Sequence, residues 1–161
     1  MMGMRVSCPT VTERRLPRRF DRRLLLETPG EVRQDEKMGM RVAPVAVGRR
    51  WSYHLVVVEK GTMPQVHRSG EATYYVIQGR GRAYTGKAER RNGAYHASWS
   101  MTVELAAGLT FVVPLGYAHT LKNSSREPLM VVLRCPDGHF ESDRFVVENL
   151  PSLQRATAPS R

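Results

Sequence analysis

Residues 108–123 read GLTFVVPLGYAHTLKN, and this pattern predicts a short apolar strand, a tight turn and a returning strand. Pro114 presets the backbone angle of the first turn corner, and Gly116 accepts the positive φ that the second corner requires. Side chains two residues apart on a strand share a face, so Tyr117 and His119 point to the same side of the returning strand. The pattern therefore holds one imidazole on a rigid strand beside a turn.

The sequence on both sides of this hairpin has the same cadence of short apolar strands separated by turn residues. Turn signals such as Lys60-Gly61 and Asn92-Gly93 stand between them, and no long helical periodicity interrupts the pattern. Such a succession indicates an all-β sandwich or barrel. The predicted strands cover residues 40–47, 51–59, 61–67, 74–78, 81–85, 95–105, 109–113, 118–121 and 129–134.

One predicted strand, residues 95–105, alternates apolar and polar side chains, which places Trp99 and Met101 on one face. The connection before it, residues 86–98, is long and carries two arginines and His96. Loops on a rigid scaffold often carry specificity, so a pocket wall or a lid is one interpretation of this connection. A strand at a dimer contact is the other.

A second informative stretch, residues 61–79, reads GTMPQVHRSGEATYYVIQG. Gln65 and His67 stand two residues apart, so on a strand they share a face. If this strand and the one that carries His119 belong to the same barrel, both imidazoles point into one interior. Glu71 is the carboxylate closest to His67 in this stretch.

These two stretches resemble the two signature motifs of the cupin superfamily, and the resemblance covers residues 49–134. Residues 108–123 fill every defining position of the second motif, whereas the first motif, G-x5-H-x-H-x3/4-E-x6-G, is degenerate. Counted forward from the glycine at position 61, the two histidine positions fall on His67 and Ser69. Counted back from the glycine at position 79, the two histidine positions and the glutamate position fall on Gln65, His67 and Ala72. His67 is a ligand position in both registers, and the choice between them stays open.

The resemblance implies an all-β, cupin-like double-stranded β-helix, which is a jelly-roll barrel. It also implies a divalent transition metal, either Fe, Mn, Ni or Zn, held by His67 and His119. Glu71 and Gln65 are the candidates that complete this metal site. Replacement of the other family ligands leaves open the alternative that the metal has been lost.

Further residues are candidates for the chemistry inside the barrel. A histidine or tyrosine can transfer a proton, and aromatic or arginine side chains can contact a substrate. Each candidate also has a structural reading, as an edge histidine, a core aromatic residue or an arginine in a solvated turn. The proton-transfer candidates are His54, His96 and Tyr117, and the substrate-binding candidates are Trp99, Tyr74 and Arg82.

Resemblance to small bacterial cupins implies a metal-dependent enzyme with a small-molecule substrate. The implied reactions are those of a cyclase, isomerase, lyase or dioxygenase on a polar or aromatic metabolite. Analogy with other members of the family further implies a role in natural-product biosynthesis. The metal would act as a Lewis acid. The alternative is a non-catalytic metabolite-binding cupin, a sensor or an accessory subunit, with a degraded metal site. Many small cupins are homodimers, and the resemblance implies a homodimer here.

The chain of 161 residues divides by composition into a basic N-terminal arm (1–37), a barrel (38–148) and a C-terminal tail (149–161). A run of about 18 apolar residues, which a spanning helix needs, is absent from the sequence, so we expect no membrane span. Cys8 and Cys135 stand in no metal-binding spacing, which is typical of a reduced, cytoplasmic protein.

The sequence is strongly basic, with 25 Lys and Arg against 15 Asp and Glu and a net charge of +10. Arginine pairs such as Arg14-Arg15 and Arg18-Arg19 concentrate this charge in the N-terminal arm. Arginines can bind phosphates by releasing counterions, so RNA or an acidic partner is a third hypothesis. Without interleaved aromatic residues, however, a solvated tail is the favoured interpretation, and we expect no nucleic-acid partner.

Overall fold

The computed structural model describes residues 33–47, 50–136 and 144–152, and within these ranges the chain forms strands and turns but no helix. A helix long and apolar enough to cross a membrane is accordingly not found in this part of the chain. The prediction of an all-β fold is confirmed. The strands are β1 (Arg33–Asp35), β2 (Met40–Val47), β3 (Trp51–Val58), β4 (Gln65–Val66), β5 (Ala72–Gln78), β6 (Arg80–Arg91), β7 (Ala94–Ala106), β8 (Thr110–Val113), β9 (Tyr117–Asn123), β10 (Leu129–Pro136) and β11 (Phe145–Val146).

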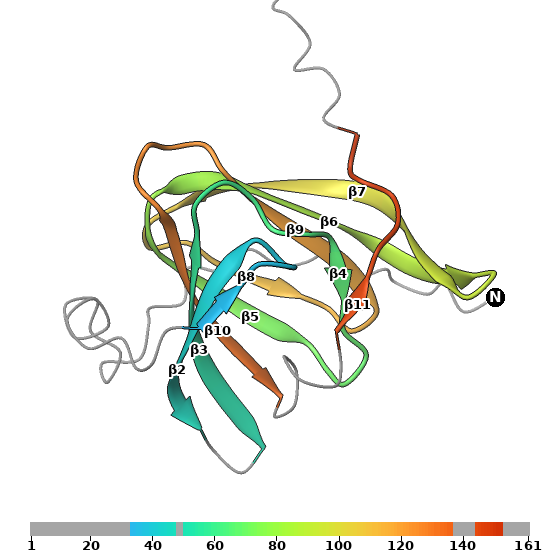
Figure 1. Cartoon of the computed structure of the whole chain (residues 1–161), viewed down its shortest axis with the longest axis horizontal. Helices are drawn as coiled ribbons and strands as arrows, with labels where there is room; N and C mark the ends of the chain where they lie inside the picture. Colours follow the sequence, from blue (N-terminus) through green and yellow to red (C-terminus); the bar gives the residue numbers. More distant parts are fainter. Residues whose placement is uncertain (1–32, 48–49, 137–143, 153–161) are drawn as a thin grey trace, which may run out of the picture.

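The strands form two antiparallel sheets that enclose the main core (Figure 1). The first sheet has the order β1-β2-β3-β10-β5-β8, and the second has the order β11-β4-β9-β6-β7. β6 and β7 form a long hairpin that extends to one side of the molecule in Figure 1. The main core draws side chains from both sheets, for example Val131 from the first and Leu121 from the second.

The first sheet is apolar on both faces. On β10, Val131 and Leu133 point into the main core, whereas Val132 belongs to a separate apolar cluster on the opposite face. Burial of such side chains stabilises the fold by about 1.5–3 kcal/mol each. Burial on both faces explains why residues 55–58 of β3 read as a continuous apolar run and not as an alternation.

A β-bulge divides the β6–β7 hairpin into two parts. The register pairs Thr85 with Met101 but Gly86 with Trp99, so Ser100 is the extra residue. Because Thr85 and Gly86 are neighbours and point to opposite faces, Met101 and Trp99 also lie on opposite faces. Met101 packs against the main core, and Trp99 packs in a separate small cluster. The prediction that one face carries both Trp99 and Met101 is therefore wrong.

The segment around β11 fastens the hairpin to β4. The Asn149 side chain accepts a hydrogen bond from the Ala97 N–H at 2.8 Å and donates one to the Ala97 carbonyl, also at 2.8 Å. The Val147 N–H donates to the Pro64 carbonyl at 3.0 Å, directly before β4. No sequence pattern predicts β11, because a two-residue strand has no detectable period.

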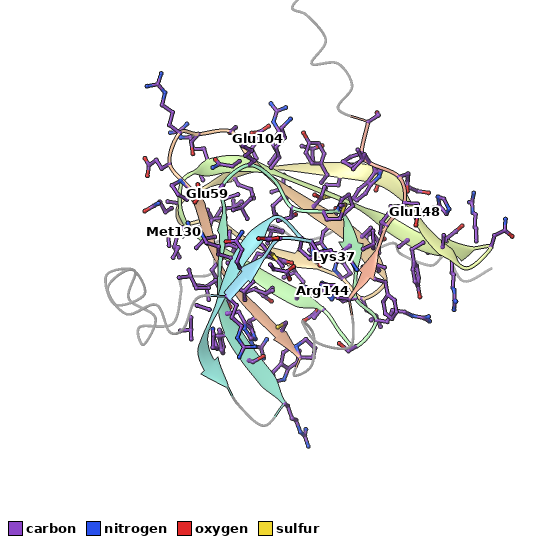
Figure 2. All side chains as sticks on the ribbon, in the orientation of Figure 1. Lys37, Glu59, Glu104, Met130, Arg144 and Glu148 are labelled. Carbon is purple, nitrogen blue, oxygen red and sulfur yellow. The ribbon has the colours of Figure 1, made fainter. Side chains whose placement is uncertain are left out.

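Strand β1 was also not predicted, since it lies inside the predicted N-terminal arm. Arg144 and Asp35 form an ion pair at 2.5 Å that joins β1 to the segment before β11, and Figure 2 shows Arg144 near β11. Predicted strand 40–47 coincides with β2, whereas predicted strand 61–67 contains only the two residues of β4. The arginine pairs of the arm and Cys8 lie outside the described residues.

Candidate functional site

Three polar side chains form a row across the second sheet. Gln65 on β4 and Thr85 on β6 are both register partners of His119 on β9. Directly opposed residues of antiparallel strands point to the same face, with Cβ atoms about 4.5–5.5 Å apart. Leu121, two residues along β9, belongs to the main core, so this face looks into the space between the sheets. The row therefore lines the interior of the barrel.

His67 joins this row from the residue that directly follows β4. Its ring stacks on the ring of His119, with a centroid distance of 5.2 Å and an interplanar angle of 28°. Both side chains are buried, with exposed fractions of 4% and 1%. The Gly116 N–H donates to the His67 carbonyl at 3.4 Å, and Gly116 has the positive φ (79°) that its turn predicts. The turn at Gly116 thus brings together two imidazoles that are far apart in the sequence.

Tyr74 contacts this pair from β5 of the first sheet. Its hydroxyl oxygen lies 2.7 Å from Nε2 of His119, and its ring stacks on Phe111 with a centroid distance of 4.8 Å. Burial raises the pKa of Tyr74, and the neighbouring Cys135 raises it further. Tyr74 therefore keeps its proton at neutral pH, and its hydrogen bond links the two sheets through the interior.

The interior row also contains buried polar atoms that lack a hydrogen bond. Every such side-chain atom in the described ranges belongs to this one group: Gln65 Oε1, His67 Nε2, Thr85 Oγ1 and His119 Nδ1. A buried polar atom without a hydrogen bond costs about 1–3 kcal/mol, and native proteins keep few of them. Their concentration around two stacked imidazoles makes this group the candidate ligand site.

The donor set fits a divalent first-row transition metal. Imidazole nitrogen is a common ligand of Zn, Fe, Ni and Cu, and oxygen donors can complete the coordination. His67 and His119 supply the nitrogens, and the amide oxygen of Gln65 and the hydroxyl of Thr85 stand in the same row. Because the Tyr74 hydroxyl is hydrogen-bonded to Nε2 of His119, Nδ1 is the ring nitrogen of His119 that can bind a metal.

The structure does not bring Glu71 to this group. Glu71 is exposed just before β5, whereas Ala72 is buried in the main core. The register counted back from the glycine at position 79 therefore describes the structure, with Gln65 and His67 at the histidine positions and Ala72 at the glutamate position. In the described ranges, no group of three or more His, Cys, Asp and Glu could hold a metal. The candidate metal site consequently lacks a carboxylate.

His54 lies in a second polar cluster inside the first sheet. Its position on β3 alternates with Val56 and Val58 of the main core, so it shares their inward face. Its Nε2 is 3.0 Å from the Ser52 hydroxyl, which is 3.9 Å from Cys135 Sγ. His54 is half-buried, which leaves part of it in contact with solvent.

The remaining predicted residues are placed as follows. Tyr117 is half-buried and packs against the main core. The bulge directs Trp99 away from the interior, and its Nε1 donates to the Asn149 carbonyl at 3.2 Å. Arg82 is exposed and forms an ion pair with Glu104 at 2.7 Å; Figure 2 shows Glu104 at the outside of the molecule. His96 lies opposite Glu89 on the hairpin, beyond the last β6–β9 pair.

Sequence reasoning missed Thr85. A weak signal existed, because Thr85 alternates with Ala83 and Gly81 on a predicted strand and so shares a face with small residues. Its place beside His119 depends on the β6–β9 register, which residue spacing does not reveal.

Comparisons with known proteins agree with this architecture. A family model described as Cupin matches residues 48–157. Similar solved structures include Bacillus subtilis oxalate decarboxylase, in a study of its Mn(II) centers, at 23% identity and a TM-score of 0.51, and a mutant of the same enzyme at 24% identity and a TM-score of 0.52. Each match covers 71% of this chain and 29% of the other, so this chain spans under a third of those proteins. A search of curated proteins found no match.

Proposed function

The chain belongs to the cupin family, and on that premise we propose that it is a metal-dependent enzyme that converts a small molecule inside the barrel. The observation that carries this proposal is the buried pair of His67 and His119, with ring centroids 5.2 Å apart. Burial of two adjacent imidazoles beside unsatisfied oxygen atoms has a cost that a bound metal ion would remove.

In this proposal, His67 and His119 hold the metal, and Gln65 and Thr85 are the adjacent oxygen donors. The metal, when bound, supplies a Lewis acid that polarises a substrate oxygen. Tyr74 fixes the His119 ring from the first sheet through its contact with Nε2. For Nδ1 to keep a lone pair, the proton of the neutral ring must sit on Nε2 and point at the Tyr74 oxygen. The Tyr74 hydroxyl oxygen can accept the hydrogen bond from this proton, and it would hold the ring in place as the outer partners of metal-binding histidines commonly do.

We also propose the type of reaction and the residue that transfers a proton in it. Cyclase, isomerase, lyase and dioxygenase chemistry on a polar or aromatic metabolite all need a proton donor or acceptor near the substrate. His54 is the best-supported candidate for that role, because it lies on the inward face of β3, is half-buried and contacts the Ser52 hydroxyl at 3.0 Å. The Mn(II) centers named for oxalate decarboxylase are consistent with a metal here, although the likeness to that enzyme is one of fold.

The experiment that tests the proposal is elemental analysis of the purified protein. We expect near-stoichiometric transition metal, lost on His67→Ala and on His119→Ala. His96→Ala is the matched control, since His96 lies on the hairpin beyond the β6–β9 pairs, and it should retain the metal. Loss of metal in all three variants, or in none, would contradict the proposed ligands.

One observation favours a second candidate, a metal-free metabolite-binding cupin. Tyr74 already satisfies Nε2 of His119. In addition, the described residues around the two histidines offer no carboxylate to a cation. For this candidate the purified protein contains no metal and binds none on titration with Mn(II), Fe(II), Ni(II) or Zn(II). Its fold and its affinity for a small-molecule ligand then survive both histidine substitutions.

A further inference from the structure

The interior wall of the barrel carries no acidic side chain in the described part of the chain. Of the buried polar residues in the described ranges, those that strand alternation or ring contact places on the inward face are Ser52, Gln65, His67, Thr85 and His119. Ala72 is buried on the inward face, and the neighbouring carboxylate of Glu71 is exposed. Every donor available beside His67 and His119 is therefore a neutral group.

A divalent ion on neutral donors keeps its full charge. Inside a protein, a charge without a compensating partner is costly, because the interior solvates it far less than water does. An anion that binds the ion directly removes much of that cost. Protein carboxylates usually serve this purpose at metal sites, and here the described wall supplies none.

We infer that the site binds its metal together with an anionic, chelating small molecule, and that the substrate is of this class. A carboxylate with an adjacent oxygen donor fits this description. The inference rests on the proposed function, because it presumes that His67 and His119 hold a metal. Gln65 bears on this requirement directly, since its amide oxygen is buried without a hydrogen bond and Gln65 is the register partner of His119, so a carboxylate at this position would neutralise the ion.

The inference predicts mutual reinforcement between metal and anion. If the anion raises the affinity for the metal, the metal raises the affinity for the anion by the same factor. Couplings of this kind are typically about 5- to 150-fold, and we expect an increase of about tenfold in metal affinity. A neutral molecule of the same shape should give no increase.

The experiment is a Co(II) titration followed by visible absorbance, alone and with glycolate, after correction for the Co(II) that glycolate binds in solution. Glycolamide is the matched neutral probe. The wild type should bind Co(II) about tenfold more tightly with glycolate and unchanged with glycolamide. Equal affinity in all three conditions overturns the inference.

The decisive variant is Gln65→Glu, which has nearly the same shape and adds one negative charge to the wall. It should bind Co(II) more tightly than the wild type without any anion, and the increase caused by glycolate should largely disappear. Gln34→Glu is the matched control, because it makes the same change on exposed β1 and should leave both quantities unchanged. An undiminished effect of glycolate in Gln65→Glu overturns the inference.

The proposed function fails by a different result. A wild type that binds no Co(II), with or without glycolate, contradicts the metal site itself, and the inference falls with it. A wild type that binds Co(II) through His67 and His119 with an affinity that glycolate does not change contradicts only the inference that an anion binds together with the metal.

Discussion

The Tyr74 hydroxyl oxygen lies 2.7 Å from Nε2 of His119, and this contact joins β5 of the first sheet to β9 of the second through the interior. Both side chains are buried, and the Tyr74 ring also stacks on Phe111 at 4.8 Å. The contact orients one proposed metal ligand from the opposite sheet. It makes the ring orientation of His119 depend on the packing of the core.

Tyr74→Phe tests the value of this contact for stability. The substituted ring can keep its stacking on Phe111, but Nε2 of His119 loses its partner. We expect a loss of about 1–3 kcal/mol in the free energy of unfolding at pH 7, the usual cost of an unsatisfied buried group. Urea denaturation measures this loss. An unchanged midpoint and slope would show that the contact contributes nothing.

The same variant reveals a pH dependence. Burial raises the pKa of Tyr74 in the folded state above its ordinary value of 10.0. Above pH 10 the unfolded chain releases this proton while the folded chain retains it, so stability falls as the pH rises. The contribution is complete below pH 10 and declines above it, by up to about 1.4 kcal/mol for each pH unit.

The measurement is the difference in unfolding free energy between the wild type and Tyr74→Phe at pH 8 and at pH 11. Other titrating groups are common to both proteins and cancel in the difference. The wild type should lose more stability than the variant across this interval. Parallel losses would contradict the elevated pKa.

Ala72→Glu restores a carboxylate at the position where the family motif has glutamate. Without metal, the buried charge should destabilise the fold by about 3 kcal/mol or more, because it has no partner. Mn(II) should then raise the melting temperature more in the variant than in the wild type, since tighter binding to the folded state stabilises it further. Ala106→Glu, at an exposed position of β7, should show neither effect.

Asn149→Ala tests the fastening of the hairpin to β4. The substitution removes two hydrogen bonds to the Ala97 backbone, both at 2.8 Å. We expect a loss of about 1–3 kcal/mol in unfolding free energy, together with faster amide exchange of the Ala97 N–H. Glu148→Ala removes an exposed neighbouring side chain and is the control. Equal behaviour of the two variants would contradict this role for Asn149.

The sequence predicted an all-β sandwich or barrel from local patterns, and the resemblance to the cupin motifs singled out the two histidines. Strand alternation and turn residues are short-range signals, and the spacing around His119 carries a turn whose geometry depends on Gly116. The interior partners were not accessible in this way. Thr85 reaches His119 through strand register, and Trp99 leaves the interior because of a bulge at Ser100 that interrupts a regular alternation.

The choice between the two registers of the first motif also required the structure. Glu71 and Ala72 are neighbours, and strand geometry sends them to opposite sides, so one residue decides whether the site has a carboxylate. The structure exposes Glu71 and buries Ala72. A spacing pattern cannot decide this, because the turn at Ser69-Gly70 can absorb one residue.

The central claim is that His67 and His119 bind the same metal ion inside the barrel, and anomalous diffraction from crystals soaked in Mn(II) tests it most directly. The account predicts one strong anomalous peak between the two imidazole rings, absent from crystals of His119→Ala. A peak elsewhere with none between these rings, or no peak at saturating Mn(II), would contradict it.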